Sequence, residues 1–275
     1  MARREQGLRR KKSKRQQVMP VLPNVFTTGN LSFGLLSILT SIEIASAMGA
    51  GTASEAWVFR RFWWAGAFIV ISFFFDTLDG RLARFIKHES SFGLSYDSIS
   101  DIVSFGVAPA VLIYVWTLMD KGKLGLMAVI VYVVCAALRL ARFNVQSGTV
   151  ERFSFTGLPS PVAAGLMVSP LMLIASLKIM PDERVLWYYL IAAPVIGLLM
   201  VSNVKYTKRP ALRLGGPFNA LVVAAIIIAA VITNPEIMFI FLVYLYAVAG
   251  LVLHALRYLT GKSSVQEETG PGGAG

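Results

Sequence analysis

Long apolar blocks separated by short polar stretches run through most of this chain. Eight of these blocks approach or exceed the roughly 20 residues that an α-helix needs to cross a bilayer. They cover 22–47, 62–86, 94–118, 124–145, 159–180, 184–204, 217–233 and 235–258. Proline marks several boundaries, at Pro159, Pro181 and Pro235. Because transmembrane strands would be shorter and would alternate in polarity, the pattern predicts helices.

We therefore expect an all-α fold, a polytopic transmembrane bundle of about eight helices. The composition agrees, because 56% of the residues are hydrophobic and only 15% are charged, against about a quarter charged in a typical soluble domain. The single cysteine, Cys135, cannot form an internal disulfide. The two histidines are far apart and do not suggest a zinc site.

The distribution of basic residues predicts the orientation in the membrane. Most of the 26 Lys and Arg residues lie in the tail 1–20 and in those loops that share its side of the membrane. By the positive-inside rule, both termini are then cytoplasmic, including a disordered tail at 260–275. The basic tail has no aromatic or fold motif for nucleic acid, so we expect it to contact membrane lipid. A cleaved signal peptide is the alternative for this end, although the apolar run is long for one.

Four aspartates interrupt the apolar pattern: Asp76, Asp79, Asp97 and Asp101. At about 100° per residue, Asp76 and Asp79 share one helix face, and Asp97 and Asp101 share a face of the next helix. The connection between the two helices is short, so they are expected to be antiparallel neighbours. The four carboxylates can therefore converge near the cytoplasmic side of the bundle.

Converging carboxylates repel one another unless they are protonated or bound to cations. Oxygen ligands suit magnesium, manganese or calcium, and two such ions could hold a diphosphate. Gly80, Ala83 and Gly93 leave room for a ligand near the backbone, and Arg84 offers a fork for phosphate. Transporters also bury carboxylates, so a proton or ion pathway is the alternative interpretation.

The pattern D-x2-D-G-x2-A-R-x8-G-x3-D-x3-D, from Asp76 to Asp101, resembles the signature of the CDP-alcohol phosphotransferase family. The resemblance implies a six-helix catalytic domain, here 21–204, followed by two additional helices in 205–259, and a homodimer. It implies that two Mg²⁺ or Mn²⁺ ions per active site are bound by Asp76, Asp79 and Asp97. Asp101 would be a further ligand or the general base. Gly80, Ala83 and Arg84 would line the CDP site, with Gly93 allowing close approach.

Four further stretches resemble the integral-membrane family members that use L-serine as the acceptor. They are "LPNVFTTGN" (22–30), "SFGVAPA" (104–110), "ALRLARFNV" (137–145) and "FTGLPSPVAAG" (155–165). The expected reaction transfers a phosphatidyl group from CDP-diacylglycerol to L-serine at the cytoplasmic side of the cell (inner) membrane. Arg139 and Arg142 are candidates for binding the serine carboxylate, or else anchor the inner face. Glycerol-3-phosphate or an inositol-type alcohol would be the alternative acceptor.

Overall fold

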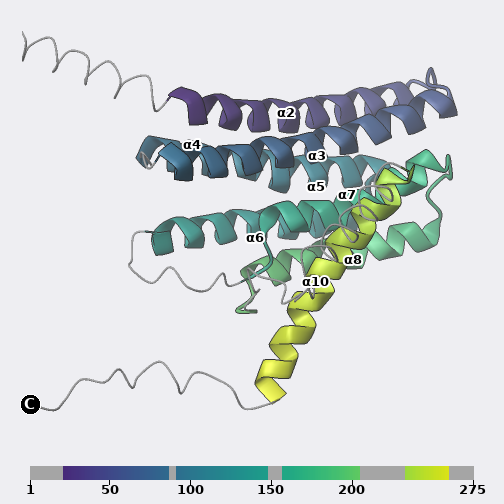
Figure 1. Cartoon of the computed structure of the whole chain (residues 1–275). Coiled ribbons are helices and arrows are strands. Elements are labelled where there is room, and N and C mark those ends of the chain that lie inside the picture. The colour runs from purple at the N-terminus through teal and green to yellow at the C-terminus, as the bar shows by residue number, and fades with distance from the viewer. Residues whose placement is uncertain (1–20, 87–90, 148–156, 205–232, 260–275) are drawn as a thin grey trace, which may run out of the picture.

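The chain is described by a computed structural model that places residues 21–86, 91–147, 157–204 and 233–259. Over these ranges every regular element is a helix, as predicted (Figure 1). In chain order they are α2 (Val21–Gly49), α3 (Glu55–Ile86), α4 (Ser91–Asp101), η1 (Ile102–Val107), α5 (Ala108–Ile113), η2 (Tyr114–Leu118), η3 (Met119–Lys121), α6 (Lys123–Ser147), α7 (Ser160–Ser176), α8 (Glu183–Val201) and α10 (Pro235–Leu259).

Within the described ranges, six helical segments are long and apolar enough to cross a membrane. They are Asn24–Gly49, Glu55–Arg81, Phe92–Lys121, Lys123–Val145, Glu183–Val201 and Pro235–Ala255. The predicted helix at 159–180 is shorter, because α7 ends at Ser176 after 17 residues. The predicted helix at 217–233 falls almost wholly outside the described residues. The all-α bundle of apolar helices is thus confirmed.

The second helix begins seven residues earlier than the apolar block that predicted it, at Glu55 rather than at residue 62. Ser54 precedes it and accepts a hydrogen bond from the Trp57 N–H at 3.4 Å, in the manner of an N-terminal cap. Arg61 therefore lies in the helix rather than in a loop. Its guanidinium pairs with Glu43 of α2 at 2.9 Å, and both side chains of the pair are exposed.

The predicted helix at 94–118 is one continuous helical segment that widens twice into a π-helix, at η1 and at η2. The first widening has a cause in the sequence. Pro109 lacks an N–H, and its ring would clash with the carbonyl four residues earlier, that of Phe105. The Phe105 carbonyl instead accepts a hydrogen bond from the buried Tyr132 hydroxyl of α6 at 2.8 Å. The π-turn that results begins directly after Asp101.

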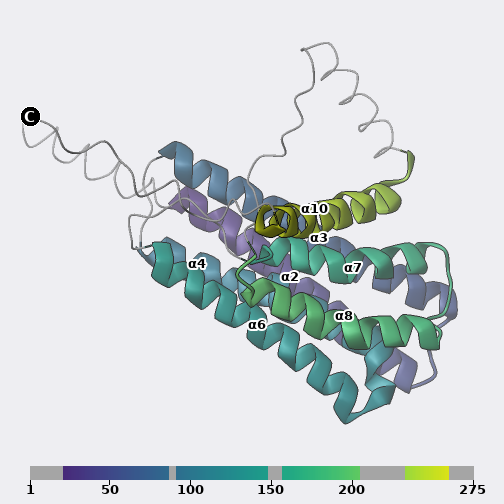
Figure 2. The same ribbon diagram turned by 90° about the horizontal axis from the view of Figure 1, so that it is seen from below.

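The helices form one bundle in which segments far apart in sequence lie side by side. α2 lies along α3, α6 packs beside α8, and α10 crosses the bundle obliquely over α7 (Figures 1 and 2). Because neighbouring helices alternate in direction, α2, α4 and α7 begin at the same end of the bundle at which α3, α6 and α8 finish. The four aspartates of the signature lie at this end.

Candidate active site

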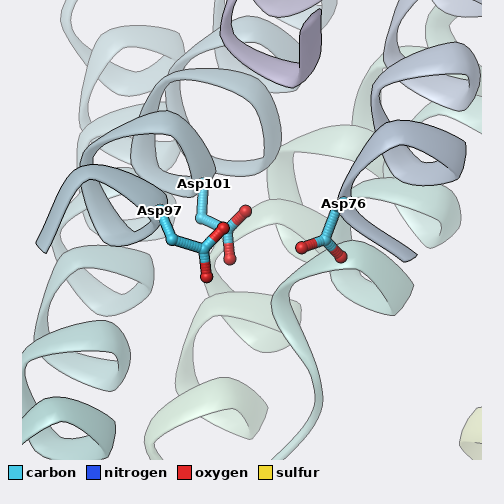
Figure 3. A group of neighbouring side chains, drawn as sticks. All are labelled: Asp76, Asp97 and Asp101. Carbon is cyan, nitrogen blue, oxygen red and sulfur yellow. The ribbon is translucent and has the colours of Figure 1, made fainter. Parts of the chain in front are cut away.

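Three carboxylates from two helices meet at this end of the bundle. Asp76 of α3 faces Asp97 and Asp101 of α4 across the space between the two helices (Figure 3). One oxygen from each of the three lies within 4.8 Å of the others. The helices remain regular through these positions, so the spacing of four between Asp97 and Asp101 puts both carboxylates on the face toward α3. The convergence expected from the sequence is present for these three aspartates.

Asp79, the fourth aspartate, is turned toward α2. Its side chain is 6% exposed, and its Oδ2 accepts a hydrogen bond from the Thr27 hydroxyl. It remains close enough to Asp76 and Asp97 for the like charges to repel one another. The four carboxylates thus form one acidic group, in which the neutral Thr27 hydroxyl holds Asp79.

Asp101 is also held by α2. The Asn30 side-chain amide donates a hydrogen bond to Asp101 Oδ1 at 3.1 Å. Both side chains are deeply buried, since Asn30 is 0% and Asp101 9% exposed. One oxygen of Asp101 therefore has a protein donor, and the other is available to a ligand.

The two candidate arginines of α6 have different surroundings. Arg142 spans to the end of α8, where Nη1 donates to the Val201 carbonyl at 3.3 Å and Nη2 to Asn203 Oδ1 at 2.9 Å. Arg139 instead lies close enough to Asp101 for their opposite charges to attract. Its Nη1 donates to the Ser160 hydroxyl at the start of α7, at 3.1 Å. Its buried Nε has no hydrogen-bond partner among the described residues.

The remaining signature residues lie on the same two helices. Gly80 of α3 is exposed and Gly93 of α4 is half-buried, and neither carries a side chain that would obstruct a ligand. Ala83 and Arg84 belong to the last turns of α3, where only the helical backbone is described. The expected phosphate fork of Arg84 therefore remains a prediction.

Sequence reasoning did not assign a role to Thr27 or Asn30. Both lie in the stretch "LPNVFTTGN", which the resemblance marked without naming any side chain in it. A usable signal was present, because Thr27 and Asn30 are three residues apart and therefore share one face of a predicted transmembrane helix. What the sequence could not show is that this face meets the aspartates.

Comparison with known proteins agrees with this geometry. The family model described as CDP-alcohol phosphatidyltransferase matches residues 20–199, which include the acidic group and extend almost to the end of α8. The chain belongs to the CDP-alcohol phosphatidyltransferase family. It is therefore a multi-pass membrane protein with an acidic group suited to divalent cations.

Similar proteins include three that carry the name CDP-diacylglycerol–serine O-phosphatidyltransferase. The one from Methanocaldococcus jannaschii is 39% identical over 178 residues, covering 65% of this chain and 79% of the relative. The one from Mycobacterium leprae is 32% identical over 262 residues, covering 91% of this chain and 80% of the relative. The one from Helicobacter pylori is 31% identical over 188 residues, covering 68% of this chain and 71% of the relative.

Proposed function

We propose that this enzyme transfers the phosphatidyl group from CDP-diacylglycerol to the hydroxyl of L-serine, with phosphatidylserine and CMP as products. The observation that carries the proposal is the meeting of Asp76, Asp97 and Asp101 oxygens within 4.8 Å of one another, in the order that the family signature prescribes. The names of the relatives support serine as the acceptor. A transporter would not need the glycines and the arginine of the signature.

The acidic group fits divalent metal ions. Its donors are carboxylate oxygens, which are the ligands that Mg²⁺ and Mn²⁺ prefer, and their separation lets one ion contact several of them. We assign Asp76, Asp79, Asp97 and Asp101 as ligands of two such ions per active site. When bound, the ions would neutralise the carboxylates and the diphosphate and would stabilise the departing CMP.

The rest of the donor site would come from Gly80, Ala83, Arg84 and Gly93. The exposed Gly80 and the half-buried Gly93 allow the cytidine diphosphate to approach the helix backbones. Arg84 would add charged donors for phosphate. An apolar cavity between α3, η1, α7 and α10 includes Phe73, one turn before Asp76, and Phe105, one turn after Asp101. The acyl chains of the donor would lie on this apolar side of the acidic group.

Asp101 would take the proton during the transfer. The serine oxygen forms a bond to the phosphorus next to diacylglycerol, the bond from this phosphorus to the CMP oxygen breaks, and the hydroxyl proton passes to a carboxylate. One oxygen of Asp101 accepts a hydrogen bond from the Asn30 amide, and this bond fixes the orientation of the other oxygen. In a displacement at phosphorus, much of the rate comes from holding both reactants in the orientation that the reaction requires.

Between the two candidate arginines, the contacts favour Arg139 for the serine carboxylate. Arg139 lies beside Asp101, and its Nε is buried without a partner among the described residues. Arg142 already holds the end of α8 with two hydrogen bonds. A carboxylate docked on Arg139 would bring the serine hydroxyl toward the acidic group, as the displacement requires.

The enzyme would act in the cell (inner) membrane as a homodimer. The positive-inside distribution would put both termini and the active-site end of the bundle in the cytoplasm, where serine is available. The part of the chain after residue 199 lies beyond the family match. We assign 205–259, which includes α10, to the two additional helices outside the six-helix catalytic domain.

The decisive experiment measures products with purified full-length protein in mixed micelles that contain CDP-diacylglycerol and Mn²⁺. The enzyme should release CMP and form phosphatidylserine when L-serine is added. A panel with glycerol-3-phosphate and inositol phosphate tests the acceptor. Reaction of either of these in place of serine would overturn the acceptor, whereas no CMP release with any acceptor would overturn the reaction itself.

A further inference from the structure

Two polar side chains of α2 each reach one aspartate of the signature, and the two aspartates come from different helices. Thr27 donates to Asp79 of α3, and Asn30 donates to Asp101 of α4 at 3.1 Å. Both donors are buried, at 2% and 0% exposed. Because they are three residues apart, they project from the same face of α2. This face therefore contacts both halves of the acidic group.

Hydrogen bonds to the backbone of α2 join the same three helices. The Asn30 carbonyl accepts from the Ser72 hydroxyl of α3 at 2.8 Å and from the Ser104 hydroxyl of η1 at 2.9 Å. The Thr27 carbonyl accepts from the Ser100 hydroxyl of α4 at 3.1 Å. All three serines are fully buried. Each of the two α2 residues is thus held by its backbone while its side chain holds a carboxylate.

Close packing of α2 depends on two glycines beside these residues. A Cβ at Gly29 would lie 2.4 Å from the Phe75 ring, and a Cβ at Gly34 would lie 2.3 Å from Ser104 Oγ. Neither distance is possible unless the Phe75 ring moves, in the first case, or the backbone at Ser104 shifts, in the second. The glycines therefore allow α2 to approach both α3 and η1 closely enough for the hydrogen bonds described above.

From these contacts we propose that Thr27 and Asn30 are positioning residues for the metal-binding carboxylates. They orient Asp79 and Asp101 and hold the helices that carry them at the separation that divalent cations need. Like-charged carboxylates this close together would otherwise turn apart. A donor on one oxygen of each carboxylate prevents this rotation and leaves the other oxygen toward the ions. The inference rests on the proposed function, since it assigns a role to residues around the proposed metal ligands.

The test compares variants of similar shape that lose the side-chain hydrogen-bond donor. Thr27→Val and Asn30→Leu remove the hydrogen bonds to the carboxylates, whereas Thr27→Ser keeps its donor. Ser72→Ala is the matched control, because it removes a hydrogen bond to Asn30 without touching a carboxylate. Mn²⁺ binding to the purified full-length protein, without substrates, is measured by electron paramagnetic resonance. Thermal unfolding of the metal-free proteins and steady-state kinetics complete the set.

We expect Thr27→Val and Asn30→Leu to weaken Mn²⁺ binding about 10- to 100-fold, as is usual when a group that orients a metal ligand is lost. In the same two variants, the kcat at a fixed Mn²⁺ concentration should fall as the Mn²⁺ affinity falls, while the KM for CDP-diacylglycerol changes much less. Thr27→Ser should bind Mn²⁺ as the unaltered protein does. Ser72→Ala should lower the unfolding temperature without changing Mn²⁺ affinity.

Two results would overturn the inference. One is unchanged Mn²⁺ affinity in Thr27→Val and Asn30→Leu; the other is equal weakening in Ser72→Ala, which would make the effect one of helix packing. If Asn30→Leu does not fold, the comparison of Thr27→Val with Thr27→Ser decides alone. Failure of the unaltered protein to release CMP would contradict the proposed function instead, and the Mn²⁺ comparison would still stand.

Discussion

Replacing Arg139 by methionine should weaken the binding of serine much more than the binding of CDP-diacylglycerol. Methionine keeps much of the apolar stem and removes the guanidinium. In the structure Nη1 of this group donates a hydrogen bond to the Ser160 hydroxyl at 3.1 Å. Its buried Nε makes no hydrogen bond within the described residues. It therefore has donors available to an acceptor carboxylate at the edge of the acidic group.

The size of the effect follows from the interaction that is lost. A hydrogen bond to a charged group contributes about 1.5–3 kcal/mol, and about 1.4 kcal/mol is a factor of ten in an equilibrium constant. The KM for serine should thus rise roughly 10- to 150-fold. The kcat should fall too, because Asp101 loses its neighbouring cation. Arg139→Lys keeps the positive charge but lacks the planar guanidinium fork, so its KM for serine should lie between those of the unaltered enzyme and Arg139→Met.

The assay measures initial rates of labelled-serine incorporation in mixed micelles, first with serine varied and then with CDP-diacylglycerol varied. Arg142→Met is the matched control. It should lower the unfolding temperature, because two hydrogen bonds to the end of α8 are lost, and it should leave the KM for serine near that of the unaltered enzyme. The reasoning is refuted if Arg142→Met raises this KM as much as Arg139→Met does. It is also refuted if Arg139→Met raises the KM of both substrates equally.

Further predictions concern the metals, the base, the acceptor and the fold. Excess chelator should abolish activity and added Mg²⁺ or Mn²⁺ should restore it, and full activity in chelator would exclude metal ions from the reaction. Asp76→Asn and Asp97→Asn should each weaken Mn²⁺ binding, measured by electron paramagnetic resonance, without loss of the folded state. Asp101→Asn should lower kcat about 10²–10⁴-fold yet still bind CDP-diacylglycerol, and equal loss of binding and turnover would leave it a ligand only. Gly157→Ala should destabilise the protein by about 1–3 kcal/mol or more, read by thermal unfolding, because φ is +84° and a Cβ would lie 2.1 Å from the Met200 carbonyl oxygen.

The helical architecture was predictable because bilayer-length apolar blocks have few alternatives. The residues at which the helices begin and end were less predictable. The block pattern started the second helix at residue 62, whereas α3 begins at Glu55. Hydropathy cannot show that Arg61 pairs with Glu43 on another helix. The π-turn after Asp101 was not predicted, although Pro109 was visible in the sequence, and the sequence pattern did not show that Tyr132 of α6 would hydrogen-bond the Phe105 carbonyl.

The acidic group was largely predictable because spacings of three and four have a fixed meaning in a regular helix. Helical geometry alone put Asp97 and Asp101 on one face, and the structure agrees. The same argument paired Asp79 with Asp76, yet the Asp79 carboxylate is held by Thr27. Rotamer choice is decided by the neighbouring helix, so periodicity along a single helix cannot supply it.

The four stretches that resemble the serine-using family members, 22–30, 104–110, 137–145 and 155–165, contact one another in two pairs around the signature. The backbone carbonyl of Asn30 in "LPNVFTTGN" accepts a hydrogen bond from Ser104 of "SFGVAPA", which joins α2 to η1, the segment that directly follows Asp101. Arg139 of "ALRLARFNV" donates to Ser160 of "FTGLPSPVAAG", which joins α6 to α7. If the first pair supports the metal and donor site and the second supports the acceptor, each can change without the other. A change of acceptor would then require substitutions around Arg139 and Ser160, while Thr27, Asn30 and the aspartates stay the same.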